Sequence, residues 1–447
     1  MTKPQYVKIK RIKRRVDNME NKIKELNLTN LPLSEDIDIL KSGFSSGSLS
    51  FKNRFAIQPM EGCDGTRDGE PDELTIRRYE RFAKSGAALI WAEAVAIKKE
   101  GRANPRQLFI NEKTKDSFKR LNDKIKEISL KENGFEPILI MQATHSGRYS
   151  KPNGVPEPII GYNNPLFEKD NPIDKSRIIS DDALFSLEEQ YGIAAKMAEE
   201  VGFDGIDIKC CHRYLASEML SAYEREGAFG GSFENRTRLL RNGIKNATEA
   251  TSDKFIVTSR LNVYDGFPYP YGWGVKEGGD KEVDLTEPLK LVDILHNELG
   301  VELLNITIGN PYVNSFVNRP ADCTAKLSGE DPLIGVDRMF YCTAQIQKAF
   351  PNLCVMGSGI SYMKEYLPNL AAGAIKEGML KIQGVGREAF AYPDFFKDIE
   401  HQGKMEKSKC CITCGKCTEL MRAGGTTGCV IKDNEVYMPL YKEYCMK

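Results

Sequence analysis

The sequence predicts an α/β protein built on a (β/α)8 barrel (a TIM barrel), with an N-terminal extension and a cysteine-rich C-terminal iron–sulfur segment. Eight short apolar runs of β type alternate with stretches of helical periodicity between about residues 49 and 396. No G-x-G-x-x-G follows a predicted strand, which counts against a dinucleotide-binding Rossmann domain. A barrel takes up ~250 residues as one unit. The 447 residues therefore leave room for additions at both ends.

Composition limits the classes of partner. The 63 Lys and Arg residues balance 63 Asp and Glu, so bulk electrostatics do not favour binding to nucleic acid or to an anionic membrane. No apolar run approaches the ~20 residues that span a bilayer. The N-terminus is basic but lacks the apolar core of a secretory signal. We therefore expect a soluble, cytoplasmic protein with no nucleic-acid or membrane partner.

Three regions are expected along the chain. Residues 1–48 form a charged, helix-prone extension, in which acidic residues directly follow the basic run 8–15 and so favour a solvated amphipathic helix. Residues 49–400 form the barrel, and residues 401–447 form a cysteine segment that needs a bound cluster or the barrel surface to fold. The predicted strands are 55–59, 88–92, 137–142, 205–209, 255–260, 303–307, 353–357 and 381–385, with helices such as 187–201 and 234–251 between them.

Three of these strands end in polar side chains. Gln142, Lys209 and Arg260 are the last residues of their strands, and His145 and His212 follow shortly after two of them. The carboxyl ends of the strands form the active-site face of a parallel barrel. An amide, two cations and imidazoles on that one face predict a binding or catalytic site there.

An aromatic, Pro- and Gly-rich run from Tyr264 to Trp273 follows the strand that ends at Arg260. Pro and Gly are typical of an ordered surface loop. Loops after strand carboxyl ends also line barrel sites. We expect this run to form part of the pocket wall.

Several segments resemble the Old Yellow Enzyme family (NADH:flavin oxidoreductases). They occur in the family's order over residues 49 to 429, so chance is a poor explanation. The C-terminal cysteines place the resemblance nearer the iron–sulfur branch, which includes 2,4-dienoyl-CoA reductase, 2-enoate reductase and trimethylamine dehydrogenase. The segments are Asn53–Met60, Asp68–Pro71, Tyr79–Gly86, Gln142–Arg148, Gly202–Leu215 and Gly230–Arg236.

The resemblance implies a bound FMN at the top of the barrel. Gln can donate to and accept from the pyrimidine edge of the flavin, and an Arg near N1 stabilises the anionic reduced form. Glycines let backbone N–H groups approach the phosphate, and Arg adds a bidentate grip. The implied isoalloxazine contacts are Pro59, Met60, Gln142 and Arg260, and the implied phosphate contacts are Gly357, Ser358, Gly359, Gly386 and Arg387.

The resemblance also implies the catalytic residues. The family holds the substrate oxygen with a pair of His, or His and Asn, and protonates the substrate with a Tyr two residues on. Here Lys209 takes the first position, His212 the second, and Tyr214 the position of the Tyr. Lys keeps a hydrogen-bond donor but replaces a planar ring with a mobile charge. The expected reaction is hydride transfer from reduced flavin N5 to the β-carbon of a conjugated carbonyl or related compound.

Five of the 12 cysteines lie between Cys410 and Cys429. A C-x-x-C-x-x-C motif with a distal Cys supplies four thiolates, which suits a 4Fe-4S cluster. A structural zinc site is the alternative. The expected ligands are Cys411, Cys414, Cys417 and Cys429, although Cys410 can replace Cys411 in register.

The sequence leaves open where the electrons come from. Family members with this cluster often continue into FAD- and NAD(P)-binding domains, whereas this sequence ends 18 residues after Cys429. We expect either direct reduction by NAD(P)H or a separate redox protein that docks near the cysteine segment. The sequence leaves open whether the chain forms a homo-oligomer.

Two other functions stay open at this point. The same residues and cofactors can catalyse electron transfer in the opposite direction. The protein would then be a dehydrogenase that oxidises an amine or another donor and passes electrons out through the cluster. A non-catalytic barrel stapled by zinc would instead be a binding module. A small-molecule substrate is expected for either enzyme.

Overall fold

The computed structural model describes residues 16–446. The basic run 8–15 lies outside the described residues. Residues 16–25 are helical, and Val16 and Ile23 of this helix are buried. Across the described chain, no helix has the length and apolar character needed to cross a membrane.

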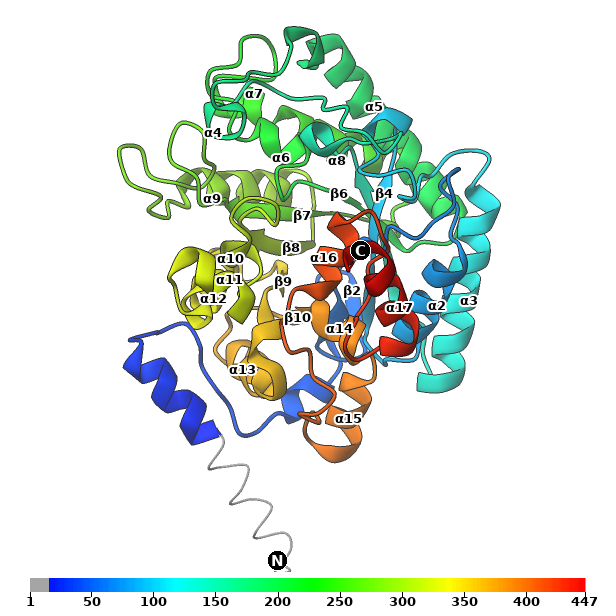
Figure 1. The fold of residues 1–447 in the computed structure, drawn as a ribbon, viewed down its shortest axis with the longest axis vertical. Helices are drawn as coiled ribbons and strands as arrows, with labels where there is room; N and C mark the ends of the chain where they lie inside the picture. Colours follow the sequence, from blue (N-terminus) through cyan, green and yellow to red (C-terminus); the bar gives the residue numbers. More distant parts are fainter. Residues whose placement is uncertain (1–15, 447) are drawn as a thin grey trace, which may run out of the picture.

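A closed barrel of eight parallel strands forms the centre of the molecule (Figure 1), which confirms the predicted fold class. The order around the barrel is β10-β3-β4-β5-β6-β7-β8-β9. Every predicted strand forms, because strands buried on both faces give nearly continuous apolar runs in the sequence. The strands are β3 (Phe55–Ile57), β4 (Leu89–Ala96), β5 (Ile138–Thr144), β6 (Gly205–Ile208), β7 (Ile256–Tyr264), β8 (Leu303–Ile308), β9 (Cys354–Gly357) and β10 (Ile382–Val385).

A hairpin of β1 (Phe44–Ser46) and β2 (Leu49–Phe51) precedes the barrel. Its Leu49 and Phe51 pack with residues at the beginnings of the barrel strands, among them Leu89 and Cys354. Apolar packing therefore fills the amino-terminal end of the barrel. The polar strand ends lie at the opposite end, where they are available for a site.

Helices follow the strands as expected for this fold. The predicted helix 234–251 forms as two helices that meet at Thr237, whose Oγ1 donates to the carbonyl of Phe233. The longer helices are α2 (Glu73–Ala83), α3 (Lys115–Asn133), α5 (Asp181–Glu200), α8 (Arg238–Ala250), α9 (Thr286–Asp293), α12 (Pro332–Ala349), α13 (Leu367–Lys376), α15 (Phe395–Gln402) and α17 (Asn434–Cys445). The short ones are α4 (Pro165–Glu168), α6 (Leu215–Met219), α7 (Phe233–Arg236), α10 (Ser315–Asn318), α11 (Asp322–Ser328), α14 (Arg387–Ala391) and α16 (Lys416–Arg422).

The C-terminal segment, red in Figure 1, folds back onto the barrel. Asp433 accepts bonds from Arg77 (2.8 Å) and from Arg81, both on α2. The backbone N–H of Thr427 donates to the carbonyl of Gly62, in the loop after β3, at 2.6 Å. A small apolar cluster of Leu420, Val430, Tyr437 and Tyr441 forms within the segment. Barrel contacts and this cluster together position α16 and α17.

The predicted region boundaries cross two elements. Position 48/49 falls in the β1–β2 hairpin, and position 400/401 falls inside α15. The division into residues 1–48, 49–400 and 401–447 stays a prediction.

Candidate functional site

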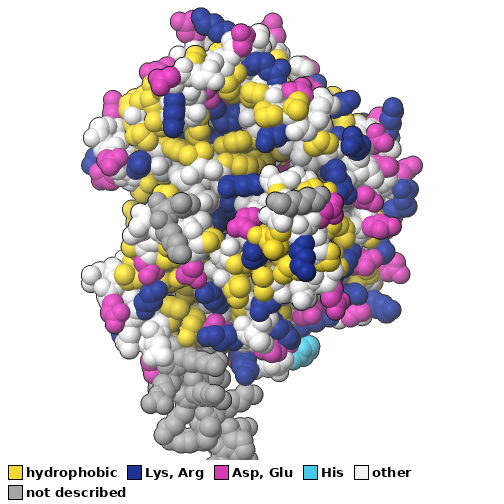
Figure 2. All heavy atoms as spheres, in the orientation of Figure 1, with side chains coloured by type: hydrophobic (Ala, Val, Ile, Leu, Met, Phe, Trp, Pro, Cys, Tyr) yellow, Lys and Arg dark blue, Asp and Glu magenta, His cyan; other side chains and the backbone are white. Residues whose placement is uncertain are grey.

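A cavity of about 1110 Å³, part of it open to solvent, lies between the carboxyl ends of the strands and the C-terminal segment. A hollow with yellow and dark blue side chains is visible near the middle of the face in Figure 2. The structure brings nearly all the predicted flavin and catalytic residues to this cavity. They are Pro59, Met60, Gln142, Lys209, His212, Tyr214, Arg260, Ser358, Gly359, Gly386 and Arg387. Gly357 is buried in β9 behind them, and its carbonyl accepts from Gln58 at 3.0 Å.

Asp207, buried in β6, positions two of these residues. Its Oδ2 accepts from Gln142 Nε2 at 2.6 Å and from Trp91 Nε1 at 2.8 Å, and its Oδ1 accepts from the Arg260 backbone N–H at 2.6 Å. Burial raises the pKa of Asp207 to about 6, opposed by these hydrogen bonds. The Gln142 amide is thereby held by its nitrogen, and its oxygen is the atom offered to a ligand.

Arg260 presents a cation to the cavity. Its buried Nε has no hydrogen-bond partner within residues 16–446. A buried guanidinium needs an acceptor, and an anionic ligand atom satisfies that need.

The loop after β6 carries the predicted catalytic residues in a strained conformation. His212 and Arg213 have φ values of 63° and 60°, in the left-handed region that non-glycine residues rarely adopt. Arg213, which sequence reasoning left without a role, is buried and pairs with Asp265 at 3.0 Å. It also donates to Ser221 Oγ at 2.8 Å. Arg213 therefore holds the loop in place.

The aromatic run 264–273 does not line the cavity, so the expected pocket-wall role is wrong. Asp265 instead binds Arg213, and the Phe267 ring centroid lies 5.1 Å from the Arg213 guanidinium carbon. Trp273 is buried. The run packs behind the catalytic loop because Arg213 requires a counter-ion there.

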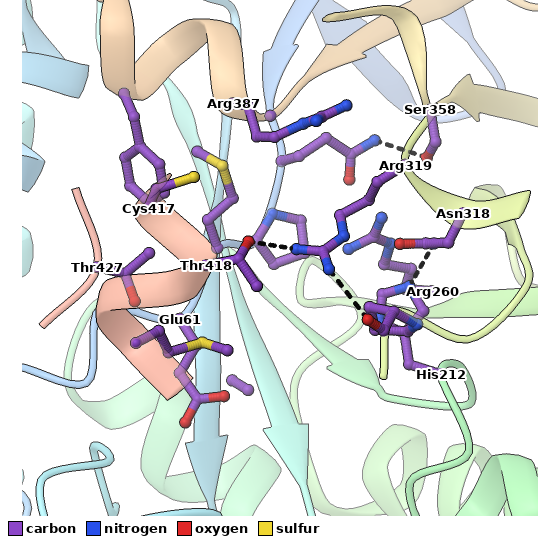
Figure 3. A pocket seen from close by; sticks show the side chains of 18 of the residues that line it. Glu61, His212, Arg260, Asn318, Arg319, Ser358, Arg387, Cys417, Thr418 and Thr427 are labelled. Carbon is purple, nitrogen blue, oxygen red and sulfur yellow. Dashed lines mark hydrogen bonds between the residues drawn. The ribbon is translucent and has the colours of Figure 1, made fainter. Parts of the chain in front are cut away.

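His212 and Lys209 lie beside Tyr214. His212 Nε2 accepts from Asn318 Nδ2 at 3.0 Å, which places the imidazole proton on Nδ1 (Figure 3). Burial, together with the nearby cation of Arg260, lowers the pKa of His212 well below its usual range, so the ring is neutral. Lys209 Nζ lies 3.4 Å from the Tyr214 ring centroid. Burial lowers the pKa of Lys209 to about 8.

Sequence reasoning missed two partners of Tyr214. Its Oη lies 2.9 Å from Tyr312 Oη and 3.3 Å from Glu61 Oε2. Glu61 is the one carboxylate lining the cavity among the described residues, and Asn104 Nδ2 donates to its Oε1 at 2.9 Å. Burial raises the pKa of Glu61 and raises that of Tyr214 well above its usual value. A signal for Glu61 was present, since it directly follows Met60 after a strand end.

The predicted phosphate contacts form the opposite end of the cavity. Gln58 Nε2 donates to Ser358 Oγ at 2.9 Å, and Gly359 adopts the left-handed φ of 76°. Arg387 Nη2 donates to the carbonyl of Pro320 at 3.0 Å. Gln58 also lines the cavity and was not predicted, although it directly follows β3 within the segment Asn53–Met60.

A second cavity, of about 370 Å³, is lined by Cys411, Cys414, Cys417 and Cys429. Two of these sulfurs accept hydrogen bonds from the backbone. The N–H of Thr413 donates to Cys411 Sγ at 3.4 Å, and the N–H of Lys432 donates to Cys429 Sγ at 3.3 Å. The Sγ of Cys410 instead donates to the carbonyl of Glu406, and Cys410 does not line this cavity.

The geometry of the thiols differs from that of a single-ion site. In the described chain, no three His, Cys, Asp or Glu side chains converge closely enough to hold one metal ion. The two cavities also share a wall, because Arg387, Phe390 and Cys417 line both.

Comparison with known proteins identifies the chain. The model of the NADH:flavin oxidoreductase / NADH oxidase family matches residues 43–273. The chain belongs to this family. The flavin oxidoreductases of this family include Old Yellow Enzyme, so the resemblance seen in the sequence is confirmed, and membership excludes the non-catalytic binding barrel.

Individual relatives share less than a third of their aligned residues with this chain. An NADPH dehydrogenase of Halalkalibacterium halodurans is 31% identical over 207 residues, which cover 45% of this chain and 57% of that protein. The 2-naphthoyl-CoA reductase complex superposes with a TM-score of 0.72 at 19% identity, over 92% of this chain and 58% of that one. Histamine dehydrogenase from Rhizobium sp. 4-9 superposes with a TM-score of 0.67 at 20% identity, over 89% of this chain and 52% of that one. This chain thus spans little more than half the length of each of these proteins.

The cavity fits the flavin that the family implies. Arg260, whose Nε has no hydrogen-bond partner among the described residues, supplies a cation, and Gln142 supplies an amide oxygen. Ser358, Gly359 and Arg387 supply a hydroxyl, a backbone turn and a cation, which suit an anion. These donors match the pyrimidine edge and the phosphate of FMN.

We expect Arg387→Met to weaken FMN binding by about ten- to a hundredfold, since a charge-assisted hydrogen bond contributes ~1.5–3 kcal/mol. Titration of the apoprotein with flavin checks this. Riboflavin, which lacks the phosphate, is the matched control ligand, and its affinity should hardly change. Equal losses for FMN and riboflavin would contradict the assignment of Arg387 to the phosphate.

Proposed function

We propose that the protein is an FMN-dependent ene-reductase that acts on a conjugated carbonyl or a related unsaturated compound. Reduced FMN supplies the hydride in such a reaction. The observation that carries the proposal is the grouping of Lys209, His212 and Tyr214 at the cavity that fits the flavin. Two of these groups can polarise an oxygen, and the third is a neutral acid.

Lys209 and His212 hold the substrate oxygen. The proton on His212 Nδ1 can be donated because Asn318 occupies Nε2. A neutral imidazole and a protonated Lys are hydrogen-bond donors suited to the negative charge that develops on the oxygen. The Asn318 contact fixes the ring orientation before substrate arrives.

Tyr214 protonates the α-carbon. Its raised pKa keeps the phenol protonated at neutral pH, so it acts as an acid. Tyr312 and Glu61, both in contact with its Oη, can return a proton after transfer. Burial raises the pKa of Glu61, which makes that carboxyl a better proton carrier than an exposed one.

The four thiols that line the second cavity support a 4Fe-4S cluster held by Cys411, Cys414, Cys417 and Cys429. Such a cluster supplies one-electron transfer to or from the flavin site. The overlapping C-x-x-C pairs that share Cys414 favour a cluster over zinc. None of the twelve cysteines forms a disulfide within residues 16–446, which fits a reducing compartment such as the cytoplasm. Electrons then arrive from NAD(P)H at the flavin or from a separate redox protein at the cluster.

Glu61 supports a second candidate, the dehydrogenation of an amine with electrons leaving through the cluster. A buried carboxylate beside Tyr214 can hold a substrate ammonium. A neighbour of the same fold is a histamine dehydrogenase. Turnover of amines in place of enones would establish this direction.

We expect Tyr214→Phe to slow flavin reoxidation by an enone about 10²- to 10⁴-fold, the usual contribution of a general acid. Reduction of the flavin by NADH or NADPH, followed by stopped flow without any added protein, should be unchanged. Ferricyanide, which accepts electrons without a proton on carbon, is the control acceptor. Unaltered enone reduction by this variant would rule out Tyr214 as the proton donor. Slow reduction of the flavin by both NADH and NADPH would indicate that a protein is the electron donor.

The rate of enone reduction should fall as the pH rises through about 8. Lys209 is protonated below its pKa of about 8 and loses its charge above it, so polarisation of the oxygen weakens on the alkaline side. A pH profile of kcat/KM for the enone checks this. Lys209→Arg should move the alkaline limb upward by more than two pH units, because Arg stays protonated. If the alkaline limb of the profile does not move, a group other than Lys209 causes it.

Cys411→Ser should lower the iron content and remove the visible absorption of the cluster, whereas Cys410→Ser should leave both unchanged. The two residues are neighbours, but Cys411 alone of the pair lines the thiol cavity. Iron and zinc analysis after anaerobic purification measures the difference. Loss of iron in Cys410→Ser alone would reverse the assignment, and zinc in place of iron would contradict the cluster.

A further inference from the structure

Two arginines of the cavity converge on one backbone oxygen. Arg319, just after α10, reaches across the cavity and donates through Nη1 to Thr418 on α16 at 2.7 Å (Figure 3). Its Nη2 donates to the carbonyl of Pro311 at 3.0 Å. Arg422, the last residue of α16, donates to the same carbonyl at 3.0 Å. Two guanidinium groups thus lie side by side at the wall of the cavity.

Neither arginine has a carboxylate to neutralise it. Within residues 16–446, neither Arg319 nor Arg422 forms an ion pair, and both line the cavity. Arg319 is half-buried and Arg422 is exposed at the edge of the cavity. Arg387 lines the same cavity, so three guanidinium groups concentrate positive charge here. Like charges held close together repel one another, and a bound anion relieves that repulsion.

The proposed flavin contacts do not include these two cations. They assign Arg387 to the phosphate and Arg260 to the pyrimidine edge, and both residues line the cavity. Arg319 and Arg422 remain, on the side formed by the C-terminal segment. The cavity is also open in part to solvent, so a second ligand can enter it beside the flavin.

We propose that Arg319 and Arg422 form an anion subsite that binds a carboxylate or phosphate group of the ligand that reacts with the flavin. This rests on the proposed function, because the subsite lies in the flavin cavity. Two guanidinium groups match the oxygens of such an anion. Tyr312 and Met421 of the same wall offer contact to an apolar body. The loop that supplies Arg319 also supplies Tyr312, the partner of Tyr214, so an anion held here lies on the side of the proton donor.

The anion can come from either of two ligands, the unsaturated acceptor or the nicotinamide hydride donor. The chemistry of recognition is the same for both. The two half-reactions separate them, because each ligand has an uncharged counterpart. Benzamide is the neutral counterpart of benzoate as a ligand of the oxidised holoenzyme, and 1-benzyl-1,4-dihydronicotinamide is the neutral counterpart of NADPH.

The experiment uses the holoenzyme and the variant Arg422→Met, whose exposed position spares the core. Benzoate and benzamide are titrated and followed by the flavin absorbance. Flavin reduction by NADPH and by 1-benzyl-1,4-dihydronicotinamide is followed by stopped flow. We expect either the affinity for benzoate or the rate of flavin reduction by NADPH to fall about ten- to a hundredfold, because a charge-assisted hydrogen bond is lost. The value for the neutral counterpart should not change. Arg319→Met should lower the value for the same charged ligand.

Arg120→Met, an exposed arginine on α3, is the matched control and should change neither pair. Arg422→Lys keeps the charge without the planar fork and should give an intermediate loss. A loss confined to benzoate assigns the subsite to the acceptor, and a loss confined to NADPH assigns it to the hydride donor. Equal behaviour of charged and neutral members in both arms overturns the proposal. Failure of an enone to reoxidise the wild-type flavin after its reduction with dithionite would instead contradict the proposed function.

Discussion

A buried carboxylate, Asp207, is the constraint on which the flavin side of the site depends. It lies in the short strand β6 and binds groups from β4, β5 and β7. A buried ion in the barrel interior is costly unless every lone pair is used. The Trp91 indole, the Gln142 amide and the Arg260 backbone satisfy it, and in return two of them are fixed in direction. The orientation of the ligand-binding amide is therefore set by the barrel itself rather than by a loop.

The C-terminal segment completes the cavity that the barrel begins. Its helix α16 contributes Cys417, Thr418 and Arg422 to the lining. The segment is secured at α2 through Asp433 and at the loop after β3 through Thr427. The chain between β8 and α12 adds Tyr312 and Arg319, and Arg319 donates to Thr418 of α16. Parts that are far apart in sequence thus form one enclosure with polar groups directed inward.

The sequence alone was sufficient for the barrel and for the residues at strand ends. Parallel strands are apolar on both faces, and a polar residue such as Gln142 or Arg260 at the end of such a run marks the active-site face. Residues on long loops were not found. Glu61, Tyr312 and Arg319 carry no periodic signal, and their place depends on how the loops pack. The aromatic run 264–273 was misplaced because its position follows from the pairing of Arg213 with Asp265, a contact across 52 residues that local pattern does not contain.

Arg387, Phe390 and Cys417 belong to the walls of both cavities. The two compartments therefore share part of one wall, which is built from α14 and α16. A change of size or polarity at any of these three positions alters both compartments at once. A substitution here that suits a new ligand in one cavity must therefore also leave the other cavity able to bind its own ligand.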